Sequence, residues 1–358
     1  MSYRGEPMAP AKLKLVVASY LEPDLVAAIA AVDPARLDVV YEPSLLPKPR
    51  YAADHVGAPL VRTQEEEARW RALLAAADVL FDFDHTNLDA LPVLAPKVQW
   101  LQATSAGIGQ LVARQGYTTR MPRTIFTTAS GVHAQPLAEF AALAMLAFSR
   151  GLFTMIAQQR EKRWERFAAS DLVGKTALIY GYGSIGEEVA RQTRALGVTC
   201  VGVNRSGRAG ALRSGGDLGV AVHPPSALHA LLPAASFLVL AAPHTKETEK
   251  VIGARELALL PKGAIVINVA RGALIDEPAL VEALATGHLG GAALDVFATE
   301  PLPAASPLWA MPSVLVSPHS ASTSARENAL IVDLFCANLR KFLAGEPLEN
   351  VLDVSVGY

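Results

Sequence analysis

The stretch "TALIYGYGSIGEEVARQTRALG", residues 176–197, decides the fold of this 358-residue chain. It contains an apolar run of strand character, three glycines spaced as G-x-G-x-x-G, and an amphipathic helical segment. A second strand-like run, "TCVGV", follows at 199–203. This order of strand, glycine turn, helix and strand predicts the unit that binds a dinucleotide at the start of a helix.

Each glycine of the turn has a distinct expected role. Gly181 makes the tight turn, Gly183 lets a pyrophosphate approach the backbone, and Gly186 lets the helix pack against the strand. The pyrophosphate would lie on the free N–H groups of the helix N-terminus, at Ser184 and Ile185. The alternative is a glycine turn that binds no ligand.

The residues after the second strand bear on which dinucleotide is bound. About 20 residues beyond the glycines, an Asp or Glu would bind the ribose 2′-hydroxyl of NAD. This chain has Asn204, Arg205 and Ser206 there. An amide, a guanidinium and a hydroxyl can all donate hydrogen bonds to a 2′-phosphate, and a guanidinium can do so through two bonds. We therefore predict that NADP(H) is preferred and that NAD(H) is possible; the alternative is a solvated pair of surface arginines, Arg205 and Arg208.

Short apolar runs alternate with amphipathic helical segments along the whole chain. The strand-like runs are apolar on both faces, which is typical of parallel strands covered by helices on both sides. The class is therefore α/β. The expected strands lie within residues 12–20, 77–83, 98–106, 124–130, 176–181, 199–204, 236–243, 263–270, 290–297 and 313–319.

Two boundaries are expected in this pattern. Near residue 131 a strand ends and a long helical stretch begins, which we expect to run over 134–166. Near residue 320 begins "TSARENALIVDLFCANLRKFLAG", which reads as one long helix that closes the chain. If that helix returns to the first domain, residues 132–320 form an inserted dinucleotide-binding domain, and 1–131 with 321–358 form the substrate domain.

Three polar residues at expected strand ends suit one chemistry. They are Arg271, Glu300 and His319. In an open α/β sheet, ligands bind beyond the carboxyl ends of the strands. Histidine can deliver a proton near neutral pH, a carboxylate beside it favours its protonated form, and a guanidinium can hold a carboxylate and polarise a carbonyl. Together they supply what reduction of a 2-oxo acid needs, whereas each one alone is more often a solvated loop residue.

Several motifs carry a resemblance to a known family. "GYGSIG", "INVARGALIDEPALVEAL", "GAALDVFATEPLP" and "SPHSAS" resemble the D-isomer-specific 2-hydroxyacid dehydrogenases, from about residue 98 to the C-terminus. The resemblance implies a Rossmann-type doubly wound parallel sheet inserted into a flavodoxin-like α/β substrate domain, and a homodimer formed through the cofactor domains. This chain has no acidic residue after the second strand, and in this respect it resembles the branch of glyoxylate and hydroxypyruvate reductases.

The resemblance also implies roles for individual residues. Arg271, Glu300 and His319 match the catalytic residues, and Asp295 matches the residue that contacts the nicotinamide amide. The further cofactor contacts fall on Pro243, Thr248, Val269 and Ala270. The loop "TSAGI" matches the segment that binds the substrate carboxylate through backbone N–H groups, with Ser105, Ala106, Gly107 and Ile108 nearest. Arg271 is the further substrate-binding residue, as anchor of the carboxylate and as electrophile.

The expected activity is transfer of a hydride from NADPH or NADH to a small 2-oxo acid, which gives the D-2-hydroxy acid. Glyoxylate, hydroxypyruvate or an aryl pyruvate would be the substrate. Formate dehydrogenases of the same superfamily carry Gln where this chain has Glu300, which argues against that activity. Two alternatives stay open, namely a nucleotide-sensing corepressor that binds peptides and a phosphite dehydrogenase.

Composition limits the partners and the location. Half the residues are hydrophobic, 18% are charged and the formal net charge is −2, so we expect neither nucleic acid nor a membrane as a partner. Cys200 and Cys336 each lie in an apolar stretch, which indicates buried thiols, no metal site and a reducing cytoplasm. The apolar runs at 13–18 and 138–148 are too short for a signal peptide and a membrane span, respectively.

Overall fold

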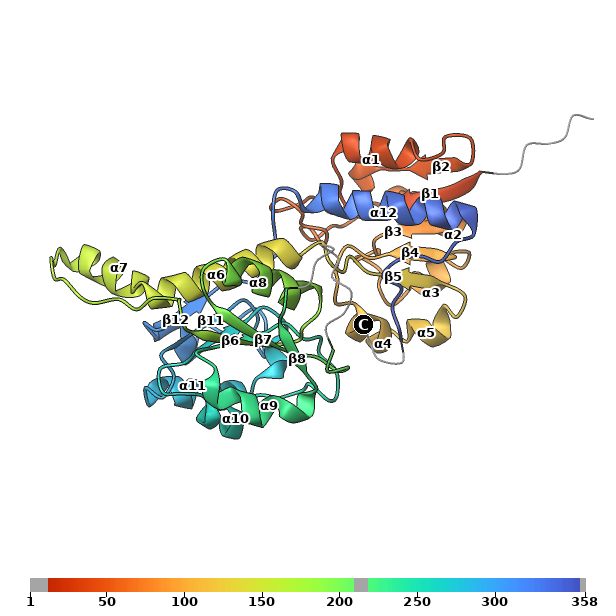
Figure 1. The fold of residues 1–358 in the computed structure, drawn as a ribbon. Helices are drawn as coiled ribbons and strands as arrows, with labels where there is room; N and C mark the ends of the chain where they lie inside the picture. The colour runs from red at the N-terminus through yellow and green to blue at the C-terminus, as the bar shows by residue number, and fades with distance from the viewer. Residues whose placement is uncertain (1–11, 209–217, 355–358) are drawn as a thin grey trace, which may run out of the picture. The chain divides into compact units, whose positions relative to one another are not determined.

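The computed structural model describes residues 12–208 and 218–354 (Figure 1). The chain divides into two compact units. Unit 1 consists of Met1–Val132 and Thr323–Tyr358, and unit 2 of His133–Ser322. Each unit is described by itself below.

Unit 1 contains a five-stranded parallel sheet in the order β2-β1-β3-β4-β5. This is the strand order of flavodoxin-like folds, so the predicted architecture is confirmed. The strands are β1 (Leu13–Val17), β2 (Leu37–Val40), β3 (Val79–Phe81), β4 (Trp100–Gln102) and β5 (Ile125–Thr127). The edge strand β2 was not predicted, because its sequence Leu-Asp-Val-Val is short and contains a charge.

Helices cover both faces of this sheet, which is why its strands are apolar on both sides. On one face, Phe335 of α12 stacks on Trp100 of β4 with ring centroids 4.8 Å apart, so the last helix packs on the first sheet. That face carries α1 (Pro23–Ala30) and α12 (Glu327–Ala344), and the other carries α2 (Gln64–Ala76), α3 (Leu91–Leu94), α4 (Gly109–Arg114) and α5 (Tyr117–Arg120). The last helix begins at Glu327 and not at 323, because a turn closed by the bond from Glu327 N–H to Ser324 O precedes it.

Unit 2 contains a seven-stranded parallel sheet in the order β12-β11-β10-β9-β6-β7-β8. The order reverses between β6 and β9, as in a Rossmann-type doubly wound sheet, so this prediction is also confirmed. The strands are β6 (Thr176–Tyr180), β7 (Thr199–Val203), β8 (Ala221–His223), β9 (Phe237–Leu240), β10 (Ile265–Asn268), β11 (Gly291–Leu294) and β12 (Val314–Val316).

The helices of unit 2 bury two separate apolar cores, one on each face of its sheet. One face packs against α6 (Ala134–Ser149) and α8 (Ser184–Arg194), and the other against α9 (Leu228–Leu231), α10 (Ala254–Leu259) and α11 (Glu277–Ala285). Short 3₁₀ turns complete the two units: η1 (Pro43–Leu45), η2 (Pro225–Ala227), η3 (Leu232–Ala234), η4 (Gly272–Leu274) and η5 (Pro307–Ala310). Cys200 and Cys336 are free and buried, as expected.

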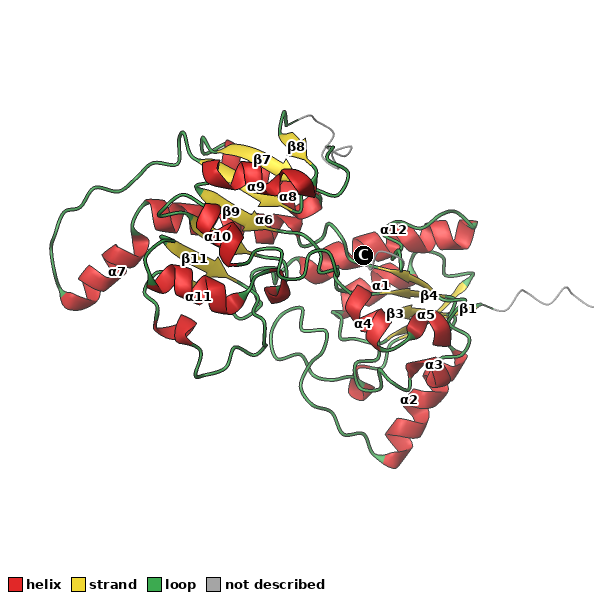
Figure 2. Cartoon of the chain, turned by 90° about the horizontal axis from the view of Figure 1, so that it is seen from below, coloured by secondary structure: helices red, strands yellow, loops and turns green. Residues whose placement is uncertain are grey.

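The helical stretch expected over 134–166 is in fact two helices. Gly151, with φ +69°, ends the first helix, and α7 (Leu152–Glu161) leaves it at 61°. Figures 1 and 2 show α7 projecting from the rest of unit 2, and it buries none of its residues. Within the described ranges no single helix is long and apolar enough to cross a membrane; α6 and α7 meet that criterion only when taken as one bent pair.

Candidate active site

The glycine turn between β6 and α8 depends on close backbone approaches and leaves the start of the helix open. Gly181 has φ +103°, and a Cβ there would lie 2.1 Å from the backbone nitrogen of Ala242. A Cβ on Gly186 would lie 2.6 Å from the Gly181 oxygen, so this glycine lets α8 approach β6. Gly183 is exposed and has open space around it. It is also the N-cap of α8 and provides no side-chain acceptor, so the first helical N–H groups, from Ser184 onward, can bind an anion.

The segment after β7 is a tight turn organised by Asn204. Its amide nitrogen donates to Tyr182 O (3.2 Å) and Arg208 O (2.8 Å). Its Oδ1 accepts hydrogen bonds from Gly207 N (2.8 Å) and Ser206 Oγ (3.1 Å). Arg205 and Ser206 are exposed at the tip of this turn. Asn204 therefore shapes the turn, while the two residues after it are the ones presented to solvent.

The segment after β10 places Arg271. Asn268, at the end of the strand, accepts a hydrogen bond from Ala270 N and donates one to Arg271 O, both at 3.0 Å. The guanidinium Nη1 donates to Ala270 O at 2.7 Å. Burial lowers the pKa of Arg271 from its usual value, while the charges of Glu300 and Asp295 act in the opposite direction. Arg271 and these carboxylates therefore form one electrostatic group.

His319 and Glu300 form a direct pair. His319 Nδ1 lies 2.7 Å from Glu300 Oε2, and Glu300 Oε1 accepts the N–H of Phe297 at 3.0 Å. The hydrogen bond with Glu300 raises the pKa of His319 above its ordinary value in spite of burial. Burial acts to raise the pKa of Glu300, but the hydrogen bonds from His319 and Phe297 N–H and the charges of His319 and Arg271 together lower it. The side chains are 46% and 35% exposed, so a substrate can reach the pair.

The backbone holds His319 in an unusual conformation. Its φ is +56°, a region that residues other than glycine adopt rarely and that is enriched at functional sites. Asp295, after β11, maintains this turn. Its Oδ1 accepts hydrogen bonds from Ser320 N and Ala321 N, both at 2.9 Å. Its carbonyl oxygen accepts a hydrogen bond from His319 N.

Two residues that sequence reasoning missed bring this group together. Gly272 follows Arg271 directly, and a Cβ there would lie 1.9 Å from the carbonyl carbon of Phe297. Only glycine therefore lets the Arg271 segment pack against the segment that leads to Glu300. Asn268, described above, was the other; its signal was a polar residue that ends the apolar strand "AIVIN".

The other expected cofactor contacts lie in segments that follow strands of the same sheet. Thr248 Oγ1 donates to Pro243 O at 2.8 Å and accepts Thr245 N at 2.8 Å, so its hydroxyl closes the loop after β9. Val269 and Ala270 are buried directly after β10. In the part of the chain that the structure describes, no group of three or more His, Cys, Asp or Glu side chains is arranged to hold a metal ion.

The expected substrate loop belongs to unit 1, between β4 and α4. Ser105 and Gly107 are exposed, Ala106 is half-buried and Ile108 is buried. The Ser105 carbonyl oxygen accepts Ala129 N at 3.1 Å, which ties the loop to the segment after β5. The structure thus groups Arg271, Glu300, His319 and Asp295 in unit 2 and places Ser105, Ala106, Gly107 and Ile108 in unit 1.

Comparison with known proteins identifies the relatives of this chain. Residues 142–321 match the model of the D-isomer specific 2-hydroxyacid dehydrogenase family, NAD binding domain. A D-isomer specific 2-hydroxyacid dehydrogenase from Xanthobacter autotrophicus Py2, solved in complex with NADPH and MES, is 30% identical, with a TM-score of 0.75 over 97% of this chain and 100% of that one. The NADPH-dependent glyoxylate/hydroxypyruvate reductase of Sinorhizobium meliloti, solved with NADP and sulfate, is 25% identical, with a TM-score of 0.75 and coverage of 97% and 100%.

A third relative differs in length. The D-3-phosphoglycerate dehydrogenase of Mycobacterium tuberculosis is 34% identical over 307 residues, which is 81% of this chain. This chain spans only 56% of the length of that relative.

Proposed function

Because this chain belongs to the family of D-isomer-specific 2-hydroxyacid dehydrogenases, which are NAD(P)-dependent enzymes, we propose that it reduces a small 2-oxo acid to the D-2-hydroxy acid with NADPH. Glyoxylate and hydroxypyruvate are the substrates we favour. The observation that carries the proposal is the contact of 2.7 Å between His319 and Glu300, with the half-buried Arg271 close enough to act on Glu300 electrostatically.

Each of these side chains has a step to perform. The raised pKa of His319 keeps a proton available at neutral pH, and the imidazolium delivers it to the carbonyl oxygen of the substrate. Glu300 holds the imidazole ring and stabilises its charged form. Arg271 binds the substrate carboxylate and stabilises the negative charge that develops on the carbonyl oxygen. The nicotinamide, when bound, supplies the hydride.

The substrate carboxylate would also bind the backbone N–H groups of the loop formed by Ser105, Ala106, Gly107 and Ile108. Ser105 and Gly107 are exposed residues, which supports this role. We propose accordingly that unit 1 is the substrate domain and unit 2 the dinucleotide-binding domain.

NADPH is the cofactor we propose, with NADH as a weaker substitute. Arg205 and Ser206 would bind the 2′-phosphate, and Asn204 would hold their turn, since both hydrogens of its amide nitrogen are already donated to carbonyl oxygens. The relatives solved with NADPH and NADP support this choice. Asp295 Oδ2, Pro243, Thr248, Val269 and Ala270 would contact the nicotinamide half.

A homodimer in the cytoplasm is the form that we propose for the enzyme. On α7 and the segment after it, large apolar side chains are exposed in the single chain: Leu152, Met155, Ile156, Trp164 and Phe167. Such a patch on a projecting arm is typical of a surface covered by another subunit. Two free, buried cysteines agree with a reducing compartment.

One panel of assays tests the proposed function. The protein is mixed with NADPH or NADH and with glyoxylate, hydroxypyruvate, pyruvate or an aryl pyruvate, and the absorbance of the reduced nicotinamide is followed. We expect turnover that the substitution His319→Asn lowers by several orders of magnitude, while NADPH still binds. Binding of NADPH without reduction of any 2-oxo acid would instead indicate a nucleotide-sensing protein, and phosphite-dependent reduction of NADP would indicate a phosphite dehydrogenase.

A further inference from the structure

A buried carboxylate lies beside the proposed substrate loop within unit 1. Asp82 follows β3 directly, is 1% exposed and has φ +68°. Its Oδ1 accepts the N–H of Thr104 at 3.4 Å. Since Phe81 of β3 pairs with Gln102 of β4, the segments after the two strands leave the sheet side by side. A strained backbone at a buried charge, at the ligand-binding edge of a parallel sheet, indicates a functional position.

Two histidines accompany this carboxylate. His85 Nε2 lies 3.4 Å from Asp82 Oδ2, and its side chain is 20% exposed. His55 Nε2 lies 3.9 Å from Glu327 Oε1 at the start of α12, and its charge also acts on Asp82. Burial acts to lower the pKa of His85, but the carboxylates of Asp82, Asp84 and Asp54 together raise it. When the His85 ring is protonated, both of its nitrogens carry hydrogen, and with Nε2 facing Asp82 the Nδ1 atom can donate to a ligand.

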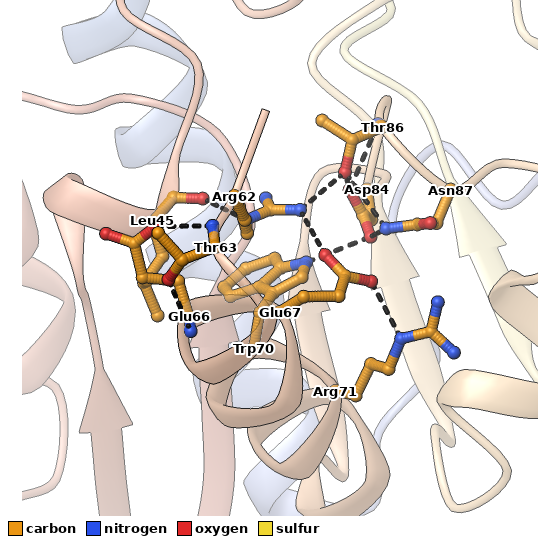
Figure 3. A network of polar contacts seen from close by, with 10 residues as sticks. All are labelled: Leu45, Arg62, Thr63, Glu66, Glu67, Trp70, Arg71, Asp84, Thr86 and Asn87. Carbon is orange, nitrogen blue, oxygen red and sulfur yellow. Dashed lines mark hydrogen bonds and ion pairs between the residues drawn. The ribbon is translucent and has the colours of Figure 1, made fainter. Parts of the chain in front are cut away.

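The loop that carries His85 is held rigidly on both sides of it. Figure 3 shows Asp84 accepting hydrogen bonds from Trp70 Nε1 (3.0 Å), Thr86 N (3.0 Å) and Asn87 Nδ2 (2.9 Å). Arg62, which is 4% exposed and lies over the Trp70 ring, donates to Thr86 Oγ1 at 3.0 Å. An imidazole fixed between two anchored residues is suited to recognition, because little conformational freedom is lost when it binds.

The charges around His85 decide which substituent of a substrate it can bind. The nearby arginines are already matched by carboxylates, Arg50 with Asp54 at 2.7 Å and Arg62 with Glu67 at 3.2 Å. The remaining groups are three carboxylates and two imidazoles: Asp82, Asp84, Glu327, His55 and His85. With ionised carboxylates and both imidazoles protonated, their sum is −3 + 2 = −1. This cluster repels a second anionic group but accepts a neutral hydroxyl group.

We propose that His85, held by Asp82, is a specificity-determining residue that hydrogen-bonds a hydroxyl group on C3 of the substrate. This inference rests on the proposed function, in which the adjacent loop binds the carboxylate at C1, two bonds from C3. The substrate class is then a 3-hydroxy-2-oxo acid whose substituent on C3 is uncharged, such as hydroxypyruvate. Acids with a second carboxylate or a phosphate on C3 are disfavoured.

The test compares kcat/KM for four acids with NADPH: hydroxypyruvate, pyruvate, which lacks the hydroxyl, and oxaloacetate and 3-phosphohydroxypyruvate, which carry a second anion. We expect the native enzyme to prefer hydroxypyruvate to the other three. His85→Leu should reduce the ratio of hydroxypyruvate to pyruvate by about 10- to 100-fold, because it removes one donor to a substrate hydroxyl. His85→Gln should retain part of the ratio. His229→Leu is the control, since His229 pairs with Glu256 in unit 2, and should leave the ratio unchanged.

The outcomes separate this inference from the proposed function. If the native enzyme reduces both hydroxypyruvate and pyruvate but His85→Leu leaves their ratio unchanged, only the role of His85 is overturned. A native preference for oxaloacetate or 3-phosphohydroxypyruvate also overturns it. Absence of turnover with every 2-oxo acid refutes the proposed function, and this inference with it. If His85→Leu does not fold, the ratio of hydroxypyruvate to pyruvate in His85→Gln and the substrate preferences of the native enzyme decide whether His85 has this role.

Discussion

Gly272→Ala should disable the site without touching any side chain in it. A Cβ at this position would lie 1.9 Å from the carbonyl carbon of Phe297 and 2.1 Å from its oxygen. Non-bonded carbon atoms approach to about 3.5 Å, so the two backbone segments must separate by about 1.6 Å (3.5 − 1.9). Because Phe297 N–H bonds Glu300 Oε1, the displacement reaches Glu300 and, through it, His319.

The expected magnitudes follow from that displacement. Overpacking costs about 1–3 kcal/mol, and a contact between two backbones belongs at the upper end. At about 3 kcal/mol, Tm should fall by roughly 6–12 °C for a unit of this size. A misplacement of more than 1 Å at a reacting group costs on the order of 100-fold in kcat. The Kd for NADPH should change less than kcat does, because the glycine turn between β6 and α8 is not displaced and only contacts to the nicotinamide half lie near the perturbed segments.

The assay measures kcat with hydroxypyruvate, Tm by calorimetry and Kd by the fluorescence of bound NADPH. Gly253→Ala is a matched control, because its Cβ would have Glu256 Oε2 as nearest atom at 3.4 Å and its φ is −105°. That variant should lose at most about 1 kcal/mol, as expected at a helix N-cap, and keep its kcat. Native kcat and Tm in Gly272→Ala would refute the argument that close backbone packing positions Glu300.

Four further outcomes are expected. Glu300→Gln should move the alkaline limit of 2-oxo acid reduction to lower pH in a kcat/KM profile, because the native carboxylate raises the pKa of His319. An unchanged pH profile would contradict the proposal that Glu300 stabilises the protonated form of His319. Arg271→Lys should raise KM for the oxo acid and lower kcat, since an ammonium cannot form two parallel bonds to a carboxylate; an effect on NADPH affinity alone would contradict this. Arg205→Ala should lower kcat/KM with NADPH by about 10- to 100-fold and leave NADH nearly unchanged, and high salt should narrow the native preference. Ile156→Asp on α7 should convert the proposed dimer to a monomer in light scattering; a native monomer would refute the dimer.

The architecture was predictable because its signals are local. The glycines between 181 and 186 impose their turn through backbone sterics alone, and strands buried on both faces must be apolar throughout. The same reasoning failed where a local signal was weak or interrupted. The helix over 134–166 breaks at Gly151, although apolar residues continue beyond it, and the edge strand β2 lacks a clear apolar pattern.

The residues of the candidate site and the pairing of Glu300 with His319 were predictable, but the other contacts of the site were not. Arg271, Glu300 and His319 each follow a recognisable strand, and the structure brings them into one group. Asn204 was expected to bind a phosphate, but its amide nitrogen donates to two carbonyl oxygens of its own turn. Short polar side chains often form such local hydrogen bonds with the backbone. The role of Gly272 depends on a segment 25 residues away, and no local pattern reveals it.

The sequence by itself thus determined the α/β class, the dinucleotide turn, the family and the trio of polar residues, since periodicity, glycine spacing and motifs act over a few residues. Only the tertiary structure decided which atoms join His319 to its expected partner Glu300, and that Asp82 is shared by His85 and the start of the substrate loop. These contacts join segments from different strand ends. They arise from the order and register of parallel strands, which depend on how whole layers pack and not on any single stretch of sequence.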